Sequence, residues 1–167
     1  MGVELLYPMH TYLVVSAYEG KVNVMAADWV MPVSYEPFRI GVAISPKRFT
    51  YELIKKSGEF VIAVPSLDLK DRVLRAGSVS GRDEDKSTLF RFGNGKKVNV
   101  PIIEECVANI ECVLRDDINL GDHHLIVGDV VAEDFADFAY DEGARIDRVR
   151  FIAHTWGRFT TFADKYY

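Results

Sequence analysis

Residues 23–34 read Asn-Val-Met-Ala-Ala-Asp-Trp-Val-Met-Pro-Val-Ser, and here a predicted strand loses its regular alternation. The strand pattern ends at Ala26 and Ala27, and Pro32 has no N–H to give to a strand ladder. We therefore expect an irregular loop over 26–34. Two small residues beside Trp29 leave room for a flat molecule against the backbone. A bulged strand end with Trp29 in the core is the alternative explanation.

The composition is that of an ordinary globular protein, since 49% of the 167 residues are hydrophobic and 27% are charged. The length suits one domain with a substantial core. The sequence shows no linker or internal repeat, so residues 1–167 are expected to form a single domain. The net charge of −5, without a basic tract, makes nucleic acid a poor partner.

Neither membrane attachment nor secretion is expected. Apolar runs such as residues 60–64 are far below the ~20 residues of a spanning helix, and no basic segment precedes an apolar core at the N-terminus. If Cys106 and Cys112 lie on one strand, they are ~20 Å apart, which is too far for a disulfide. They also lack metal-ligand spacing. We expect two buried thiols, no metal site and a cytoplasmic location.

Hydrophobic periodicity predicts a mainly β fold. Residues 10–18 and 22–27 form a predicted hairpin, and residues 38–44 alternate as an antiparallel strand with one face on a core. Further strands are predicted at 59–64, near Val98, and at 108–114, 125–132 and 150–156. Short helices are predicted before Gly58 and over 68–77, the second with Leu69, Val73 and Leu74 facing inward.

The segments between these elements are expected to be loops at 78–95 and 115–122, with one helical turn in 134–140. The sequence has neither alternating βαβ units nor a Gly-x-Gly-x-x-Gly motif, so a Rossmann domain is disfavoured. A closed or partly closed antiparallel barrel, with helices at its rim, fits the order of elements best.

Two hydroxyl-containing loops are candidates for anion binding. Residues 45–50 place Ser45, Arg48 and Thr50 directly before a short helix, where unpaired N–H groups and the helix dipole favour a phosphate. Plain helix capping by Ser45 or Thr50 is the alternative. Residues 78–87 combine small hydroxyls, a glycine and a lysine that are suited to the far side of the same anion. A solvated loop is the alternative there.

The sequence Gly-Asp-His-His at 121–124 lies at the mouth of a predicted hairpin. Neighbouring strand residues point to opposite faces, so His123 and His124 are not expected to share a metal ion. A single pocket-facing His123 is the stronger interpretation. The sequence contains no Gly-x-Ser-x-Gly motif, and neither cysteine lies beside a helix start or a cation. If the chain is an enzyme, its reactive group is expected to come from a cofactor.

The order of these motifs resembles the flavin reductase-like family of FMN-binding split-barrel proteins, in the branch that includes flavoredoxins and ferric reductases. The resemblance runs from about residue 7 to 132. It rests on the ordered set 23–34, Pro37, 45–50, 58–65, Ser80-Gly81, Asp85-Lys86 and Gly121-Asp122-His123.

The resemblance implies a split antiparallel β-barrel with short flanking helices that forms a homodimer, with non-covalent FMN near the subunit interface. It implies that the isoalloxazine is bordered by Asn23, Ala26, Ala27, Asp28 and Trp29. It further implies that the ribityl chain and phosphate are held by Ser45, Arg48, Thr50, Ser80 and Lys86. His123 matches the position that lies near the flavin and the nicotinamide in reductase members, which makes it the candidate catalytic residue.

Asp28 departs from the family, because many members carry serine there. A carboxylate that faces the ring disfavours an anionic reduced flavin and lowers the reduction potential, whereas one that points away does not. Residues 134–167 match no motif of the family. For His154, Trp156, Tyr166 and Tyr167 we expect core or surface packing, with contact to a partner subunit or cover over a pocket as the alternative.

The function implied is NADH- or NADPH-dependent reduction of bound FMN, with electrons passed to free flavin, a ferric complex or a protein acceptor. One alternative is an electron-transfer flavoprotein without a nicotinamide site. A non-catalytic flavin- or haem-binding domain is another.

Overall fold

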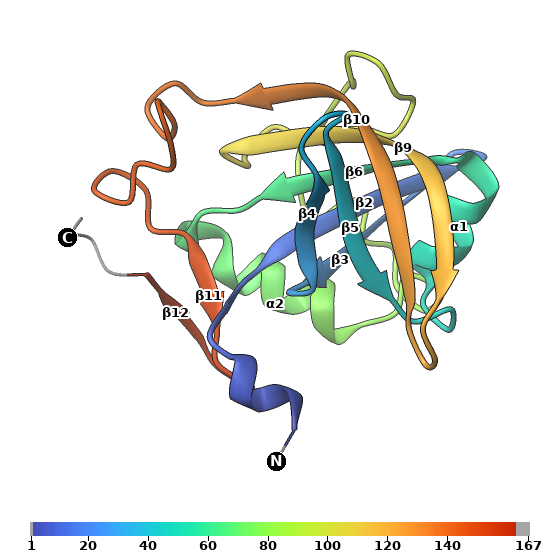
Figure 1. The fold of residues 1–167 in the computed structure, drawn as a ribbon, viewed down its shortest axis with the longest axis horizontal. Helices are drawn as coiled ribbons and strands as arrows, with labels where there is room; N and C mark the ends of the chain where they lie inside the picture. The colour runs from blue at the N-terminus through green and yellow to red at the C-terminus, as the bar shows by residue number, and fades with distance from the viewer. Residues whose placement is uncertain (1, 163–167) are drawn as a thin grey trace.

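The computed structural model describes residues 2–162, and its centre is a seven-stranded antiparallel sheet rolled into a barrel (Figure 1). The strand order is β3-β2-β6-β9-β10-β5-β4. The strands are β2 (Tyr12–Tyr18), β3 (Lys21–Ala27), β4 (Val30–Ser34), β5 (Arg39–Ile44), β6 (Glu59–Val64), β9 (Ala108–Asn119) and β10 (His124–Phe135). The edge strands β3 and β4 follow each other in sequence, so the barrel is split between them. The prediction of a mainly β split barrel with short helices is confirmed.

Alternating side chains of the sheet supply two hydrophobic clusters, one on each face. In β2, Val14 packs in one cluster while Leu13 and Val15 pack in the other. The predicted alternation of residues 38–44 is confirmed, because Val42 and Ile44 join Val14 in the same cluster. Those clusters fix the register of the sheet, since a slip of one residue would exchange its two faces.

Two helices flank the barrel, α1 (Phe49–Ser57) and α2 (Lys70–Ser78), and a 3₁₀ turn, Leu67–Leu69, leads into α2. Helix α1 ends as predicted at Gly58, whose φ of 73° suits glycine and whose N–H donates to the Ile54 carbonyl at 2.8 Å. In α2, Val73 is buried as predicted, but Leu74 is 59% exposed. The inward prediction for Leu74 is wrong because it lies about 100° around the helix from Val73.

The N- and C-terminal parts of the described chain meet in a second, three-stranded sheet beside α2 (Figure 1). It has the order β1-β11-β12. Smaller elements are β1 (Met9–His10), β11 (Ile152–His154), β12 (Phe159–Thr161), the paired β7 (Phe92–Gly93) and β8 (Ile102–Ile103), and a 3₁₀ turn, Val3–Leu6. The sequence predicted neither β12 nor this sheet.

Several predicted boundaries are wrong. The loop expected over 26–34 contains the edge strand β4, where Pro32 is tolerated because an edge strand leaves one side unpaired. Residues 115–119 belong to β9 rather than to a loop, because the β9–β10 ribbon extends beyond the core and carries charged side chains on both faces. Val98 is buried outside any strand. Residues 134–135 end β10 instead of starting a helical turn.

Both cysteines are free and buried, as expected. Cys106 precedes β9 and Cys112 lies within it, so they do not share a strand. Burial raises the pKa of the Cys112 thiol to about 12. Within residues 2–162, we find no helix long and apolar enough to cross a membrane and no group of three or more His, Cys, Asp or Glu side chains that could hold a metal ion.

Candidate cofactor site

A shelf of small residues lies where β3 ends and β4 begins. The Trp29 carbonyl accepts a hydrogen bond from the Ala43 N–H at 3.0 Å, which ties this turn to β5. The shelf borders a cavity of about 240 Å³. The cavity is lined by Tyr7, Met25, Ala26, Ala27, Asp28, Trp29, Ala43, Ile44, Ser45, Arg48 and His123. A planar ring would lie here against alanine side chains and backbone.

His123 closes one side of the shelf cavity from the tip of the β9–β10 hairpin. Strand β10 pairs with β5 so that His124 is opposite Ile44, which brings His123 to the end of β5. The ring centroids of His123 and Trp29 are 4.9 Å apart. The His123 Nδ1 atom is buried and lies 3.1 Å from Asp122 Oδ1, so the neighbouring carboxylate is its nearest polar contact. His123 therefore places an imidazole ring beside Trp29 at the edge of the shelf cavity.

His124 points to the other side of the hairpin, as predicted for neighbouring residues. Its Nδ1 atom is 2.6 Å from Asp117 Oδ1, and the Tyr51 hydroxyl donates to Asp117 Oδ2 at 2.7 Å. Lys55 adds an ion pair to the same carboxylate at 2.8 Å. Burial of Asp117 opposes ionisation, but the hydrogen bonds from Lys55, Tyr51 and His124 outweigh it and lower the pKa to about 2. This network ties the hairpin to α1.

The Asp28 carboxylate is engaged by two other parts of the chain. The Thr11 hydroxyl donates to Oδ1 at 2.7 Å, and His154 Nδ1 lies 2.7 Å from Oδ2. The Gly157 N–H in turn donates to His154 Nε2 at 2.8 Å, which assigns the Nδ1 proton to the Asp28 bond. Both Asp28 oxygens thus accept hydrogen bonds within the protein, while Asp28 also lines the shelf cavity.

His154 belongs to β11, so this contact joins the C-terminal hairpin to the shelf. Together with Asp28, it lines a separate cavity of about 350 Å³ between the shelf, α2 and β12. The alternative of a pocket-covering role thus fits His154 better than packing alone. Trp156 is 58% exposed and contacts the Tyr7 ring at a centroid distance of 5.3 Å. Tyr166 and Tyr167 lie outside the described residues.

A second cavity, of about 260 Å³, adjoins the shelf cavity and shares Met25, Ala26 and Arg48 with it. We call it the phosphate end. It is lined by Asn23, Met25, Ala26, Lys47, Arg48, Phe49, Thr50, Ala76, Gly77, Val79, Ser80, Gly81 and Lys86. Helix α1 begins here, and within residues 2–162 no side chain caps its N-terminus. The capping alternative for Ser45 and Thr50 is therefore wrong, and the free N–H groups remain available to an anion.

Asn23 and Thr50 form the floor of the phosphate end. The Asn23 amide donates to the Thr50 hydroxyl oxygen at 2.7 Å, and both residues are buried. The buried Asn23 Oδ1 atom has no partner among the described residues. A Cβ on Gly81 would lie 2.0 Å from that oxygen, so only glycine allows this close approach. A buried unpaired polar atom calls for an explanation, and a polar ligand supplies one.

Lys86 lies at this end as predicted, but its ammonium group is already bonded. It donates to the Val24 carbonyl at 3.0 Å and the Ala76 carbonyl at 2.7 Å, and the residue is 3% exposed. Burial, together with the positive charge of Arg48, lowers the pKa of Lys86. It adds positive charge beneath the cavity and joins β3 to α2.

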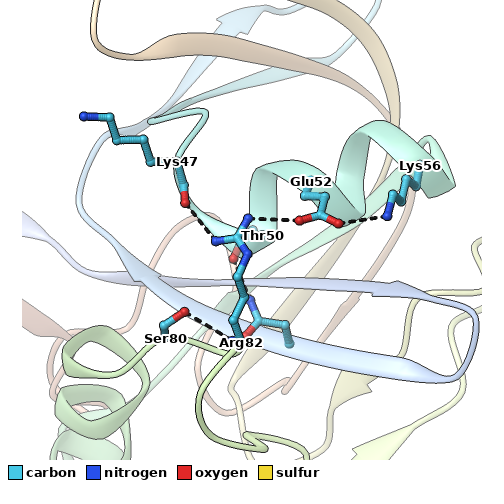
Figure 2. Close-up of polar contacts among 7 residues, drawn as sticks. Lys47, Thr50, Glu52, Lys56, Ser80 and Arg82 are labelled. Carbon is cyan, nitrogen blue, oxygen red and sulfur yellow. Dashed lines mark hydrogen bonds and ion pairs between the residues drawn. The ribbon is translucent and has the colours of Figure 1, made fainter.

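Ser80 and its neighbours close the outer wall of the phosphate end. The Ser80 hydroxyl accepts a hydrogen bond from the Arg82 N–H at 3.2 Å. The Arg82 guanidinium reaches across to the Lys47 carbonyl and the Glu52 carboxylate, and Glu52 also binds Lys56 (Figure 2). Sequence reasoning did not single out Arg82, although its loop carried the signal of small hydroxyls around a glycine.

All eleven predicted site residues therefore line two adjoining cavities. The sequence did not predict roles for Thr11 and Arg82, nor the contact of His154 with Asp28, which joins residues 126 positions apart in the chain. Together the cavities match a flat ring, a polar chain and a phosphate. Their combined size falls in the range of about 300–1000 Å³ that is usual for small-molecule sites.

Comparison with known proteins assigns the chain to a family. Residues 5–158 match the model of the flavin reductase like domain. An uncharacterised protein of Pyrococcus abyssi is 48% identical over 99% of this chain and 97% of its own length. A ferric-chelate reductase (NAD(P)H) of Archaeoglobus fulgidus is 27% identical over 78% of this chain and 79% of its own length.

Solved structures agree with this assignment. An FMN-binding protein from Thermus thermophilus superposes with a TM-score of 0.91 at 32% identity, covering 99% of this chain and 93% of that one. A flavoredoxin from Methanosarcina acetivorans gives a TM-score of 0.90 at 27% identity, covering 96% and 88%. The chain belongs to the flavin reductase-like family and has its split-barrel fold.

Proposed function

We propose that the chain is a cytosolic, homodimeric flavoprotein that binds FMN non-covalently and reduces it with NADH or NADPH. The electrons would pass to free flavin, a ferric complex or a protein acceptor. The main support for the proposal is that two adjoining cavities share lining residues. One has a shelf of small residues, and the other has the uncapped start of α1 with Arg48.

In this proposal the chain's own residues bind and orient. The uncapped α1 N-terminus and Arg48 hold the phosphate, while Ser45, Thr50 and Ser80 supply hydroxyls for the ribityl chain and phosphate. Ala26 and Ala27 let the ring lie against the backbone. Bound FMN supplies a ring that accepts a hydride and passes its electrons on.

His123 would position the nicotinamide or hold a proton beside the ring. Its ring packs on Trp29 and lines the shelf cavity. The use of NAD(P)H by the Archaeoglobus ferric-chelate reductase supports a nicotinamide donor.

The proposed dimer is supported by apolar surface beside the shelf. On the edge strand β4, Met31 is 53% and Val33 is 39% exposed. A mostly apolar cavity of about 460 Å³ next to it is lined by Val3, Leu6, Met9, His10, Tyr12, Asp28, Trp29, Val30, Met31, Ala43 and Leu125. That cavity shares Asp28, Trp29 and Ala43 with the shelf cavity. A second subunit bound here would therefore cover one side of the flavin ring.

The test is anaerobic reduction of the FMN-loaded protein. Mixing with NADH or NADPH in a stopped-flow instrument is expected to bleach the oxidised flavin band within seconds. His123→Ala is expected to slow this bleaching. His124→Ala is its control, because it removes the neighbouring imidazole on the opposite face of the hairpin.

A second candidate function is electron transfer without a nicotinamide site, which the similarity to the Methanosarcina flavoredoxin favours. It predicts that dithionite bleaches the bound flavin while neither nucleotide does. A nucleotide titration therefore decides between the two.

A further inference from the structure

A side chain that bridges two loops lies just outside the phosphate end. Arg82, in the loop after α2, donates from Nη1 to the Lys47 carbonyl at 2.9 Å and from Nη2 to Glu52 Oε2 at 2.9 Å. Its guanidinium carbon also lies 5.3 Å from the Phe49 ring centroid. Figure 2 shows Arg82 spanning from the Ser80 loop to the start of α1.

Beyond this bridge lies another cavity, of about 570 Å³. It shares Phe49 and Gly81 with the phosphate end, and Arg82, which lines the outer cavity, lies over Phe49 and next to Gly81 at the boundary between the two. Four carboxylates line the outer cavity, on Glu52, Asp83, Glu84 and Asp85. The cations of Lys21 and Arg82 line it as well, and it is large enough to hold part of a nucleotide.

We infer that the Arg82 bridge selects FMN over FAD by closing the phosphate end against a longer cofactor. This inference rests on the proposed function. FMN ends at its phosphate monoester, whereas in FAD the same phosphate continues through a second phosphate to adenosine. The bridge is the wall that such a continuation meets on its way to the outer cavity.

The energetic cost of admitting FAD comes from three groups. Arg82 must give up its bonds to the Lys47 carbonyl and the Glu52 carboxylate, and it must leave the Phe49 ring. Exposed ion pairs and cation–π contacts are individually weak, but FAD would have to break all three of these contacts together. We therefore expect FMN to bind about tenfold or more tightly than FAD.

The test measures the affinity ratio in the full chain stripped of flavin. FMN and FAD are titrated separately into the wild-type protein and into Arg82→Ala and Lys56→Ala, with binding followed by isothermal titration calorimetry. Lys56→Ala is the matched control, because it also removes one cation from Glu52 but leaves the Arg82 bridge in place. Thermal melting confirms that each variant is folded.

Wild type and Lys56→Ala are expected to favour FMN by about tenfold or more, whereas Arg82→Ala is expected to bring the two affinities to within about threefold. Equal affinities in the wild type would overturn the inference alone and leave the proposed function standing. A fall of both affinities in Arg82→Ala at an unchanged ratio would also overturn it, and would make Arg82 a phosphate ligand. Failure of the wild type to bind either flavin would contradict the proposed function as well.

Discussion

The two ends of the site differ in how the chain completes them. At the phosphate end, residues from β3, α1 and the loop after α2 are joined to one another, as in the Asn23–Thr50 bond and the Arg82–Glu52 pair. At the shelf end, His123 lines the cavity from the tip of the β9–β10 hairpin, and the exposed apolar side chains of the edge strand β4 lie beside it. This difference fits the proposal that the phosphate end holds the cofactor alone, whereas the shelf end also admits a nicotinamide or a second subunit.

The largest expected effect is at the phosphate end, in Arg48→Ala. Loss of a charge-assisted hydrogen bond to the phosphate should weaken FMN binding by about 1.5–3 kcal/mol, as measured by fluorescence titration. The exposed Lys70→Ala is the control and should leave the affinity unchanged. An unchanged affinity in Arg48→Ala would remove this residue from the phosphate site.

Gly81→Ala tests the close packing of the same end. The new Cβ would meet Asn23 Oδ1 at 2.0 Å and Phe49 Cδ1 at 3.0 Å, so the loop or the Asn23 amide must shift. Overpacking of this kind costs about 1–3 kcal/mol, and we expect it in both the unfolding free energy and the FMN affinity. Gly143→Ala is the matched control, because a Cβ there meets no atom within 4 Å. Equal behaviour of the two variants would contradict the tight fit at Gly81.

At the shelf end, His123→Ala should leave FMN affinity nearly unchanged and slow reduction by NADH or NADPH about tenfold, roughly 1.4 kcal/mol. Stopped-flow bleaching of the flavin band measures this rate. His124→Ala should instead lower thermal stability, because His124 contacts Asp117, and leave the rate close to that of the wild type. The reverse result, a slow rate in His124→Ala and a normal rate in His123→Ala, would contradict the role proposed for His123.

His154→Ala tests the engagement of Asp28. The freed carboxylate would face the shelf and disfavour the anionic reduced flavin, which should lower the two-electron potential by roughly 30 mV, about 1.4 kcal/mol. Redox titration measures the shift. Adding Asp28→Asn to His154→Ala should restore the potential, and a potential that stays low in the double variant would exclude Asp28 as its cause.

The smallest expected effect is a pH dependence of stability from Asp117. Its folded-state pKa of about 2 lies below the ordinary value of 3.8, so the contribution is present above pH 4 and is lost as pH falls toward 2. Denaturant unfolding should show a loss of about 1 kcal/mol across that window, because solvent screening reduces the contribution of the full shift. Asp117→Asn should be less stable at pH 5 and show a flatter profile. Parallel profiles for the two proteins would contradict the assignment.

The sequence predicted those parts of the fold whose side chains alternate over a core. The strand at 38–44 and the helix stop at Gly58 follow from local patterns, and both are present. Strand β4 was hidden by Pro32, and the outer part of the β9–β10 ribbon was hidden by its charged faces. Periodicity reports burial against a core, so it does not detect an edge strand or a ribbon that leaves the core.

The candidate site divides in the same way. Arg48 and Thr50 could be predicted because a helix start with cations and hydroxyls is a local signal. The bond between Asp28 and His154 joins residues 126 positions apart, and no local sequence pattern at either residue predicts the contact. Whether Asp28 faces the shelf therefore became answerable only from the packing of the C-terminal hairpin.

The central claim is that the two joined cavities bind FMN, and a titration of flavin-free protein with FMN tests it most directly. We expect one FMN bound per chain, with the flavin fluorescence changed on binding and a yellow protein after gel filtration. A protein that stays colourless and leaves the fluorescence of added FMN unchanged would contradict the account.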